Sequence, residues 1–278
     1  MTGSQDAGAH RRRLSADQRA EEILAELHRS GFASITGLSQ SLRVSDMTIR
    51  RDVRRLAEAG ELHLVHGGAR LPHGVLRTAT YAGRAEDEAE SKRAIAEVAV
   101  GLLGTAQSIV IDSGTTCFAV STALPRTYRG TVITHSVPVL QQMLTRPAST
   151  VLCLGGELLA ESQVLIGPRA TSAAREIPSD VVFLGANSVD AGGIYLMGDR
   201  EHPVKRAFIE RAARVVLLVD QSKLTRSAPV KVADLEEIDV LVTTGPIPDE
   251  LVAACVEQGV DVVDATDRSD APPRKSTD

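Results

Sequence analysis

Residues 44–56 read V-S-D-M-T-I-R-R-D-V-R-R-L, and this stretch decides the fold of the N-terminal part of the chain. Its apolar positions recur at spacings of four and three residues, which places them on one face of a helix: Ile49, Val53 and Leu56. Ser45 is a residue type that caps helix N-termini, and Gly60 is one that ends helices. The pattern therefore predicts a helix that begins at Ser45 and runs to Ala59.

The opposite face of this helix is polar and strongly basic. It carries Thr48 and four arginines: Arg50, Arg51, Arg54 and Arg55. An arginine fork binds phosphates or reads a guanine edge with two hydrogen bonds, and each good base contact discriminates by about 1–3 kcal/mol. This face therefore favours the reading of duplex DNA. The alternative is a solvated arginine face that nearby carboxylates balance, namely Asp46, Asp52 and Glu58.

Two shorter helices are predicted before this one. Ser15 and Gln18 have the spacing of a capping box, an apolar stripe follows, and Gly31 stands at the C-terminal end of the first helix. Thr36 is expected to cap the second helix. Its apolar face consists of Leu38 and Leu42. A tight turn at residues 43–45 leads into the third helix, which is typical of a helix-turn-helix.

A strand and a turn follow the three helices. Residues 61–69 read E-L-H-L-V-H-G-G-A, which is typical of a small β-wing. Residues 12–70 are therefore expected to form a winged helix-turn-helix domain. Residues 71–87 contain proline and glycine and show no clear period, so we interpret them as an interdomain linker.

The pattern changes from residue 88 onward. Short β-branched runs alternate with helix-like stretches, and the runs show no polar alternation: residues 109–111, 131–134, 151–154, 181–184, 215–219, 240–242 and 260–263. Strands of this kind are buried on both faces, which favours an α/β domain with a mostly parallel sheet over residues 88–264. Residues 265–278 are polar and contain prolines, and we expect a disordered tail there.

Composition excludes several classes of protein. The chain has 278 residues, of which 43% are apolar and 24% are charged, as in ordinary soluble proteins. No apolar run approaches the roughly 20 residues of a membrane span, and no secretory signal is expected at the N-terminus. Three scattered cysteines fit a reducing cytoplasm better than a disulfide framework. The histidines and cysteines show no metal-ligand spacing, so we expect no metal or other cofactor.

Charge is distributed unevenly along the chain. Residues 1–70 hold eleven arginines and no lysine against nine acidic residues, whereas the remaining residues hold twenty basic and twenty-seven acidic residues. A slightly basic head is thus joined to an acidic body. This division suggests a nucleic-acid-binding module attached to an unrelated domain.

Polar loops follow several of the predicted strands. The strand at residues 109–111 leads into D-S-G-T-T, where Gly114 lets the backbone approach a ligand. The threonine hydroxyls and the N–H groups of the next helix can then hold an anion. Similar loops read T-H-S at residues 134–136 and G-G-E at residues 155–157. Loops at the carboxyl ends of strands in open α/β sheets form ligand sites, although a plain capped turn is an equal alternative.

Two lysines stand out because lysine is scarce in this chain. Lys205 follows G-D-R-E-H-P-V, and Lys223 follows the strand that ends at Asp220. Each could neutralise a phosphate. On the residues alone, a surface position is favoured for both.

The N-terminal motifs resemble those of a known family. V-S-D-M-T-I-R-R-D-V-R-R-L, followed by H-G-G-A at residues 66–69, is similar to the winged helix-turn-helix of the DeoR/GlpR family of bacterial transcriptional regulators. The resemblance places the helix-turn-helix proper at about residues 33–52. It implies DNA contacts from Ser45, Thr48, Arg50, Arg51, Arg54 and His66. Leu64 stands where members often carry arginine, so one phosphate contact of the wing is not expected.

The body resembles the sensor domain of the same family. The motifs I-D-S-G-T-T, T-H-S, L-G-G-E, G-D-R-E-H-P-V-K-R-A and V-D-Q-S-K occur in the family order, and the resemblance covers roughly residues 12–264. It implies a fold similar to ribose-5-phosphate isomerase and a phosphorylated sugar or related metabolite as effector. By this resemblance, Asp112 would bind sugar hydroxyls, and the phosphate would be bound by Gly114, Thr115 and Thr116. The pocket would be lined by Ser136, Gly155 and Gly156, and Lys205 would contact the anion. The rim of the pocket would consist of Asp199, Glu201 and Lys223.

Two positions depart from the family pattern. His135 stands where the family usually has asparagine, and His202-Pro203 replaces small residues. A neutral histidine donates and accepts hydrogen bonds as asparagine does, but it is larger and it can take up a proton. We therefore expect a changed or narrowed effector preference.

These features together predict a repressor of sugar or carbohydrate metabolism genes that its effector releases from the operator. The coupling free energy between effector binding and DNA binding would be about 1–3 kcal/mol. Because such proteins bind paired DNA half-sites, a homo-oligomer is expected. The alternative is a sugar-phosphate isomerase-like enzyme with a DNA-binding head. Enolisation needs a carboxylate base, and the candidates lie in no motif for that role: Asp112, Glu157, Asp190 and Glu201. No catalytic residue is assigned.

Overall fold

The computed structural model of this chain describes residues 14–30, 32–65, 67–70 and 81–267. The chain divides into two compact units, Met1–Leu76 and Arg77–Asp278, and each unit has a hydrophobic core of its own. Residues 1–13, His66 and residues 71–80 of the expected linker lie outside the described residues.

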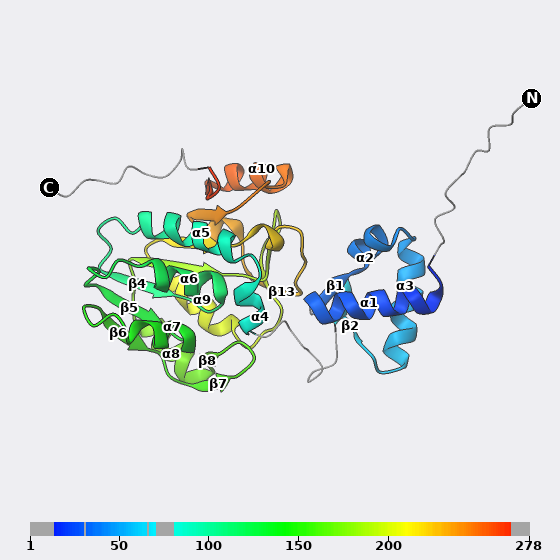
Figure 1. The fold of residues 1–278 in the computed structure, drawn as a ribbon, viewed down its shortest axis with the longest axis horizontal. Helices are drawn as coiled ribbons and strands as arrows, with labels where there is room; N and C mark the ends of the chain where they lie inside the picture. The colour runs from blue at the N-terminus through cyan, green and yellow to red at the C-terminus, as the bar shows by residue number, and fades with distance from the viewer. Residues whose placement is uncertain (1–13, 31, 66, 71–80, 268–278) are drawn as a thin grey trace, which may run out of the picture. The chain divides into compact units, whose positions relative to one another are not determined.

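Three helices and a small sheet make up the first unit, drawn in blue in Figure 1. The helices are α1 (Ala16–Ser30), α2 (Ile35–Leu42) and α3 (Asp46–Glu58). The antiparallel sheet has the order β1-β3-β2 and consists of β1 (Phe32–Ser34), β2 (His63–Val65) and β3 (Gly68–Arg70). The predicted helices and wing are confirmed. Strand β1 was not predicted, because three residues are too few to show alternation.

The N-terminal cap of α1 is the one that the sequence predicted, whereas that of α2 is a different residue. Gln18 N donates to Ser15 Oγ at 3.1 Å, and Ser15 N donates to Gln18 Oε1 at 2.9 Å, which confirms the capping box of α1. The expected cap of α2 at Thr36 is wrong. Ser34 caps this helix, since its Oγ accepts a hydrogen bond from Gly37 N at 3.0 Å.

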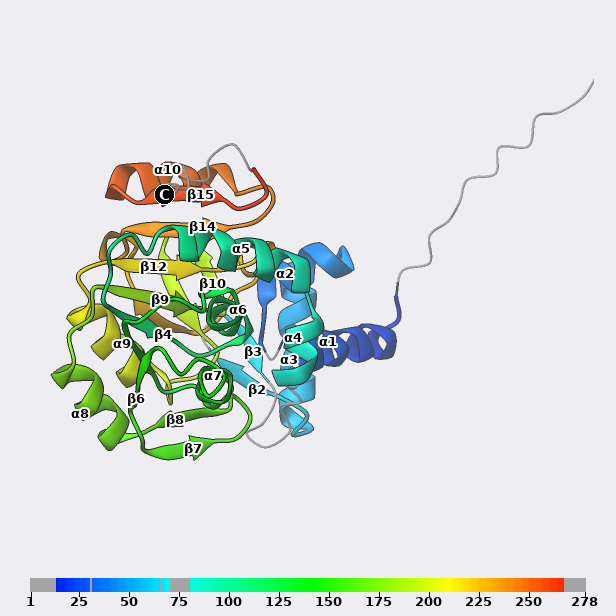
Figure 2. The ribbon, with the colours of Figure 1, turned by 60° about the vertical axis from the view of Figure 1, so that its left-hand side comes forward.

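A seven-stranded sheet forms the centre of the second unit. Its order is β15-β14-β12-β9-β4-β5-β6, and in Figure 2 its labels run from β15 near the top to β6 near the bottom. The strands are β4 (Ser108–Ile111), β5 (Thr131–Thr134), β6 (Thr150–Cys153), β9 (Val181–Gly185), β12 (Val215–Leu218), β14 (Val240–Thr243) and β15 (Asp261–Asp264). Every neighbouring pair is parallel, so the predicted mostly parallel α/β fold is confirmed.

Helices cover both faces of this sheet. One core lies against α5 (Ala89–Gly101), α6 (Thr115–Ala123) and α7 (Val137–Met143). The other core includes α8 (Pro168–Glu176), α9 (His202–Arg211) and α10 (Asp249–Gln258). Burial on both faces explains why most of these strands are continuous apolar runs. The expectation of two buried faces is wrong for β6 at the sheet edge, where Leu152 and Cys153 are exposed.

Several short elements occupy the connections and were not predicted. Strands β7 (Glu157–Leu159) and β8 (Val164–Ile166) form an antiparallel hairpin. A second small sheet consists of β10 (Ser188–Asp190), β11 (Gly193–Leu196) and β13 (Val230–Ala233). Two 3₁₀ turns are η1 (Gln221–Lys223) and η2 (Leu235–Glu237). Strands of three or four residues are too short for a period to be recognised. No helix among the described residues has the length and apolarity to cross a membrane.

Two segments that were expected to be irregular contain ordered structure. Helix α4 (Tyr81–Glu86) lies within the expected linker and packs on α6, through an edge-to-face contact between the rings of Tyr81 and Phe118. The tail was expected from residue 265, but Ala265 is buried and its N–H donates to Thr243 O at 2.8 Å. Long-range contacts, which the local pattern does not reveal, order both segments. Residues 268–278 lie outside the described residues.

Candidate functional site

The outer face of α3 is open to solvent. Ser45 caps the helix by accepting a hydrogen bond from Thr48 N at 3.3 Å. Of the four exposed arginines only Arg55 is tied to α1, through a hydrogen bond to Ala16 O at 3.2 Å and an ion pair with Asp17 at 3.4 Å. Within the described ranges the other three have no ion-pair partner: Arg50, Arg51 and Arg54. Three guanidinium groups are therefore available to a ligand.

Asp52 points into the core of the first unit instead of balancing these arginines. Its side chain is 4% exposed and accepts a hydrogen bond from Arg19 Nε at 2.7 Å. This hydrogen bond to the carboxylate raises the pKa of Arg19. The ion pair holds α1 against α3 and removes one of the three carboxylates from the outer face. The charge-balanced solvated face that was the alternative is weakened accordingly. Sequence reasoning missed Arg19.

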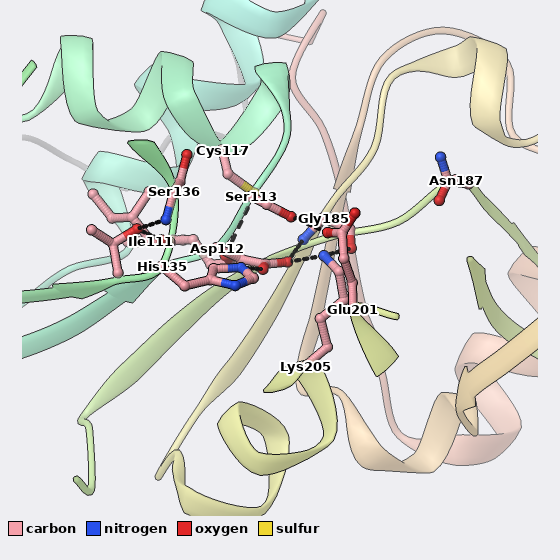
Figure 3. A network of polar contacts seen from close by, with 12 residues as sticks. Ile111, Asp112, Ser113, Cys117, His135, Ser136, Gly185, Asn187, Glu201 and Lys205 are labelled. Atoms are coloured by element: carbon pink, nitrogen blue, oxygen red, sulfur yellow. Dashed lines mark hydrogen bonds and ion pairs between the residues drawn. The ribbon is translucent and has the colours of Figure 1, made fainter. Parts of the chain in front are cut away.

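The order of the parallel sheet reverses between β4 and β9. From β4 the chain adds β5 and β6 on one side, then returns to add β9 and β12 on the other. The carboxyl ends of strands at such a reversal are where ligands bind in open α/β sheets. Figure 3 shows that polar residues from these strand ends point toward one another: Asp112 after β4, His135 after β5 and Gly185 at the end of β9. Of the three loops that were expected to converge, those of Asp112 and His135 meet, with a hydrogen bond of 2.9 Å between the two side chains.

Asp112 is the centre of the buried network in Figure 3. Its side chain is fully buried and forms an ion pair with Lys205 Nζ, while Gly185 N donates to its Oδ2 at 2.9 Å. Burial alone would raise the pKa of Asp112, but the charge of Lys205 and the hydrogen bonds from His135 and Lys205 outweigh burial and lower it. Burial alone would lower the pKa of Lys205, but the charges of Asp112 and Glu201 and the hydrogen bond to Asp112 together outweigh burial and raise it. The residues expected to bind sugar and anion therefore bind each other here.

His135 lies between two hydrogen-bond acceptors. Its Nε2 is 2.9 Å from Asp112 Oδ1, and its Nδ1 is 3.1 Å from Leu165 O in β8. Each ring nitrogen thus lies within hydrogen-bond distance of one acceptor. The ring is fully buried and packs edge-to-face on Phe208 of α9. His135 thus connects the end of β4 with the β7–β8 hairpin, a role that an asparagine amide fills less completely.

Three other cations lie within electrostatic range of Lys223: Arg84, Lys92 and Arg226. Burial lowers the pKa of Lys223; Asp220 raises it, whereas the charges of Arg226, Lys92 and Arg84 lower it further. Burial also lowers the pKa of Lys92 and of Arg84. Sequence reasoning identified Lys223 and missed the other three. The scarcity of lysine, which drew attention to Lys223, applies equally to Lys92.

The N-terminus of α6 has no side-chain cap. Gly114 precedes the helix with φ +94°, a conformation that glycine adopts without strain, and no side chain accepts from the first N–H groups. Thr115 and Thr116 stand in the first turn, 9% and 8% exposed. Thr115 Oγ1 donates to Arg84 O at 3.2 Å. Uncapped N–H groups beside several cations are the surroundings that an anion requires.

The remaining expected residues differ in how close they lie to this network. Ser136 is fully buried and its hydroxyl has no partner among the described residues. Glu201 accepts a hydrogen bond from Ser113 Oγ at 2.7 Å, whereas Asp199 is exposed. Gly156 has a structural reason to be glycine, since a Cβ there would lie 2.3 Å from Ile166 O. Gly155 adopts a positive φ of 66°, also favoured by glycine.

Family models and curated relatives both relate this chain to the DeoR family. Residues 19–75 match the model of the DeoR-like helix-turn-helix domain, and residues 87–244 match that of the DeoR C-terminal sensor domain. The HTH-type transcriptional regulator GlpR of Haloferax volcanii is 36% identical over 254 residues, which are 90% of this chain and 98% of that protein. The glycerol-3-phosphate regulon repressor of Haemophilus influenzae is 31% identical over 246 residues, which are 88% of this chain and 95% of that protein.

Solved structures give a weaker likeness. Ribose 5-phosphate isomerase A from Methanocaldococcus jannaschii aligns with a TM-score of 0.37 and 19% sequence identity, over 49% of this chain and 55% of that chain.

A winged helix-turn-helix with unpaired arginines, joined to an α/β domain with a polar site at its strand ends, defines a DNA-binding transcriptional regulator with a sensor domain. The chain belongs to the DeoR family of these regulators. Its full-length relatives are regulators and repressors, so the isomerase-like enzyme is not supported as the alternative.

Proposed function

We propose that this protein represses genes of sugar or carbohydrate metabolism and leaves its operator when a phosphorylated sugar or related metabolite binds the sensor domain. The names of relatives support the direction of control, since several of them are repressors of such regulons. The protein would act in the cytoplasm, where its operator lies.

The effector site is proposed at the start of α6. The observation that carries it is the uncapped N-terminus of α6, where Thr115 and Lys92 both donate to Arg84 O, with Arg84 and Lys223 within electrostatic range of Lys92. A phosphate there would receive hydrogen bonds from the N–H groups and hydroxyls of Thr115 and Thr116, and its charge would offset the clustered cations. The residues proposed to contact the rest of the sugar are Ser136, with its unpartnered hydroxyl, and the Asp112–Lys205 pair.

The DNA site is proposed on α3. Helix-turn-helix proteins place this helix in the major groove with its N-terminal residues toward the bases. Ser45 and Thr48 would face the phosphate backbone and the exposed Arg50, Arg51 and Arg54 would contact bases and phosphates. His66 of the wing belongs to the same proposal by resemblance. Because such modules bind paired half-sites, we propose a homo-oligomer as the binding form.

Fluorescence anisotropy tests this function directly. A labelled duplex from the region just upstream of the gene for this protein is titrated with protein at fixed salt, because DNA affinity depends steeply on salt. The titration is repeated with glycerol 3-phosphate and a panel of sugar phosphates, and with the same compounds unphosphorylated. Specific binding that one phosphorylated compound weakens is expected. Specific binding that no compound changes would contradict the effector site and leave the DNA site intact.

A further inference from the structure

Helix α4 is held at the proposed phosphate site by that site's own donors. Thr115, the first residue of α6, donates its hydroxyl hydrogen to Arg84 O at 3.2 Å. Lys92 is 5% exposed, and its ammonium group donates to Arg84 O and Asp87 O. Thus both donors that lie beside the uncapped N-terminus of α6 bind backbone carbonyls at the C-terminal end of α4.

The side chains of α4 that the structure describes add an aromatic contact from Tyr81 and an electrostatic interaction of Arg84 with Glu201. The helix has six residues, too few to be stable without tertiary contacts. The ring of Tyr81 packs edge-to-face on Phe118 at 6.5 Å, and the Tyr81 hydroxyl is buried with no partner among the described residues. The hydrogen bonds from Thr115 and Lys92 are therefore a substantial part of what holds α4 on α6.

A phosphate in the proposed position would require the same donors. The Thr115 hydroxyl has only one hydrogen, so it donates either to Arg84 O or to a phosphate oxygen. A phosphate dianion is the stronger acceptor, because hydrogen bonds to ionised groups are roughly twice as strong as neutral ones. Lys92 also interacts with the charges of Asp87, Glu88 and Asp220, and a phosphate dianion would replace the two neutral carbonyls with a charged acceptor for its ammonium group.

We propose that α4 is a latch, and that a bound phosphate competes with the carbonyl groups of Arg84 and Asp87 for Thr115 and Lys92 and so releases α4. This inference rests on the phosphate site proposed above. Its position in the chain gives it a regulatory consequence. Helix α4 is the first element of the second unit after the residues that lead from the winged helix, and the boundary between the units lies at Leu76/Arg77. Loosening α4 would therefore act on the first element of the sensor that follows the DNA-reading unit in the chain.

Hydrogen–deuterium exchange of the full-length chain tests the latch without any ligand. Thr115→Val keeps the shape of the side chain and removes the hydroxyl, whereas Thr115→Ser keeps the hydroxyl. We expect the amides of residues 81–88 to exchange about twofold to tenfold faster in Thr115→Val, the range for loss of one hydrogen bond, and at the wild-type rate in Thr115→Ser. Thr122→Val is the matched control, since Thr122 is an exposed threonine of the same helix whose Oγ1 lies 3.5 Å from Phe118 O. Equal exchange in Thr115→Val and Thr122→Val would overturn the latch.

The wild-type chain with phosphorylated probes tests the competition. The probes are inorganic phosphate, glycerol 3-phosphate and glucose 6-phosphate, with glycerol and glucose as controls. Slower exchange at residues 115–118 together with faster exchange at residues 81–88 is the expected result. Protection of residues 115–118 with unchanged or slower exchange at α4 would overturn the competition and leave the phosphate site standing. No protection at residues 115–118 with any probe would contradict the phosphate site, and the competition with it.

Discussion

Buried ion pairs hold both functional regions of this protein at the scale of single residues. Arg19 and Asp52 orient α3 from behind, while Asp112 and Lys205 join the ends of β4 and β9 to α9. Neither pair contacts DNA in our proposal. A buried ion pair contributes little net stability over apolar residues, but the loss of one partner leaves an unpaired charge and is costly.

The first prediction concerns the Arg19–Asp52 pair. Asp52→Ala should lower the free energy of unfolding of the first unit by about 3 kcal/mol, because it leaves Arg19 buried without its acceptor. Asp46→Ala is the control, since Asp46 is exposed in the first turn of the same helix and should change stability by less than about 1 kcal/mol. Urea unfolding followed by circular dichroism measures both. Equal effects would show that the pair does not orient the helix.

The second prediction concerns pH and the Asp112–Lys205 pair. The pKa of Asp112 is lowered from 3.8, so its contribution to stability is present above that value and is lost as pH falls through the folded-state pKa. The pKa of Lys205 is raised from 10.5, so its contribution is present below that value and is lost as pH rises through the folded-state pKa. The free energy of unfolding of wild type, relative to that of the double variant Asp112→Asn/Lys205→Met, should therefore be constant from about pH 5 to pH 9. Under stronger acid, wild type should lose stability relative to the variant. Thermal unfolding across this range checks it, and a slope near neutral pH would contradict the assignment.

The third prediction concerns His135. In His135→Asn a single, shorter amide nitrogen replaces the two ring nitrogens that lie against Asp112 and Leu165 O, so one amide nitrogen cannot reach both acceptors as the ring does. We expect a different order of preference among phosphorylated effectors, measured by anisotropy titrations of the operator complex. Identical titrations of wild type and variant with every sugar phosphate would remove this residue from the determinants of specificity.

At the scale of elements, α3 shows how one helix serves packing and recognition. Ile49, Val53 and Leu56 are buried while the arginines between them stay in solvent. The cap at Ser45 sets where the helix begins, and hence which side chains lie in its first turns. Helix α6 differs from α3 because no described side chain caps its N-terminus, and its first N–H groups can bind a ligand.

The fourth prediction follows from the exposed face of α3. Arg50→Ala should weaken specific operator binding by about 1–3 kcal/mol, which is roughly fivefold to 150-fold, because a base or phosphate contact is lost. Arg175→Ala on α8 removes an exposed arginine from the other unit and should leave operator affinity unchanged. Anisotropy at one fixed salt concentration compares them. An Arg50→Ala affinity within twofold of wild type would contradict the assignment of α3.

At the scale of the whole molecule, effector binding to one unit must change the DNA affinity of the other, although each unit has its own hydrophobic core. A ligand shifts DNA affinity only by as much as its own affinity differs between the two states of the protein. The fifth prediction is that Lys223→Gln raises the effector concentration needed for operator release by about tenfold, since one half-buried cation of the proposed site is lost. Competition titrations on the preformed operator complex measure this. Lys231→Gln, at an exposed lysine paired with Asp234, is the control. Release at the wild-type effector concentration would place the phosphate elsewhere.

The sequence by itself determined the elements whose signals are local. These signals depend on residues that are close to each other in the sequence, so the pattern predicted them. They are the apolar spacing and cap of α3, the capping box of α1 and the continuous apolar strands of the sheet. The tertiary structure alone decided the pairing of Arg19 with Asp52, the burial of Lys205 on Asp112, the helix at Tyr81–Glu86 and the meeting of Arg84, Lys92 and Lys223. Most of these partners are far apart in the chain. Arg19 and Asp52 meet where α1 packs on α3, whereas Asp112 meets Lys205 at the point where the order of the sheet reverses between β4 and β9, and neither arrangement follows from any local run of residues.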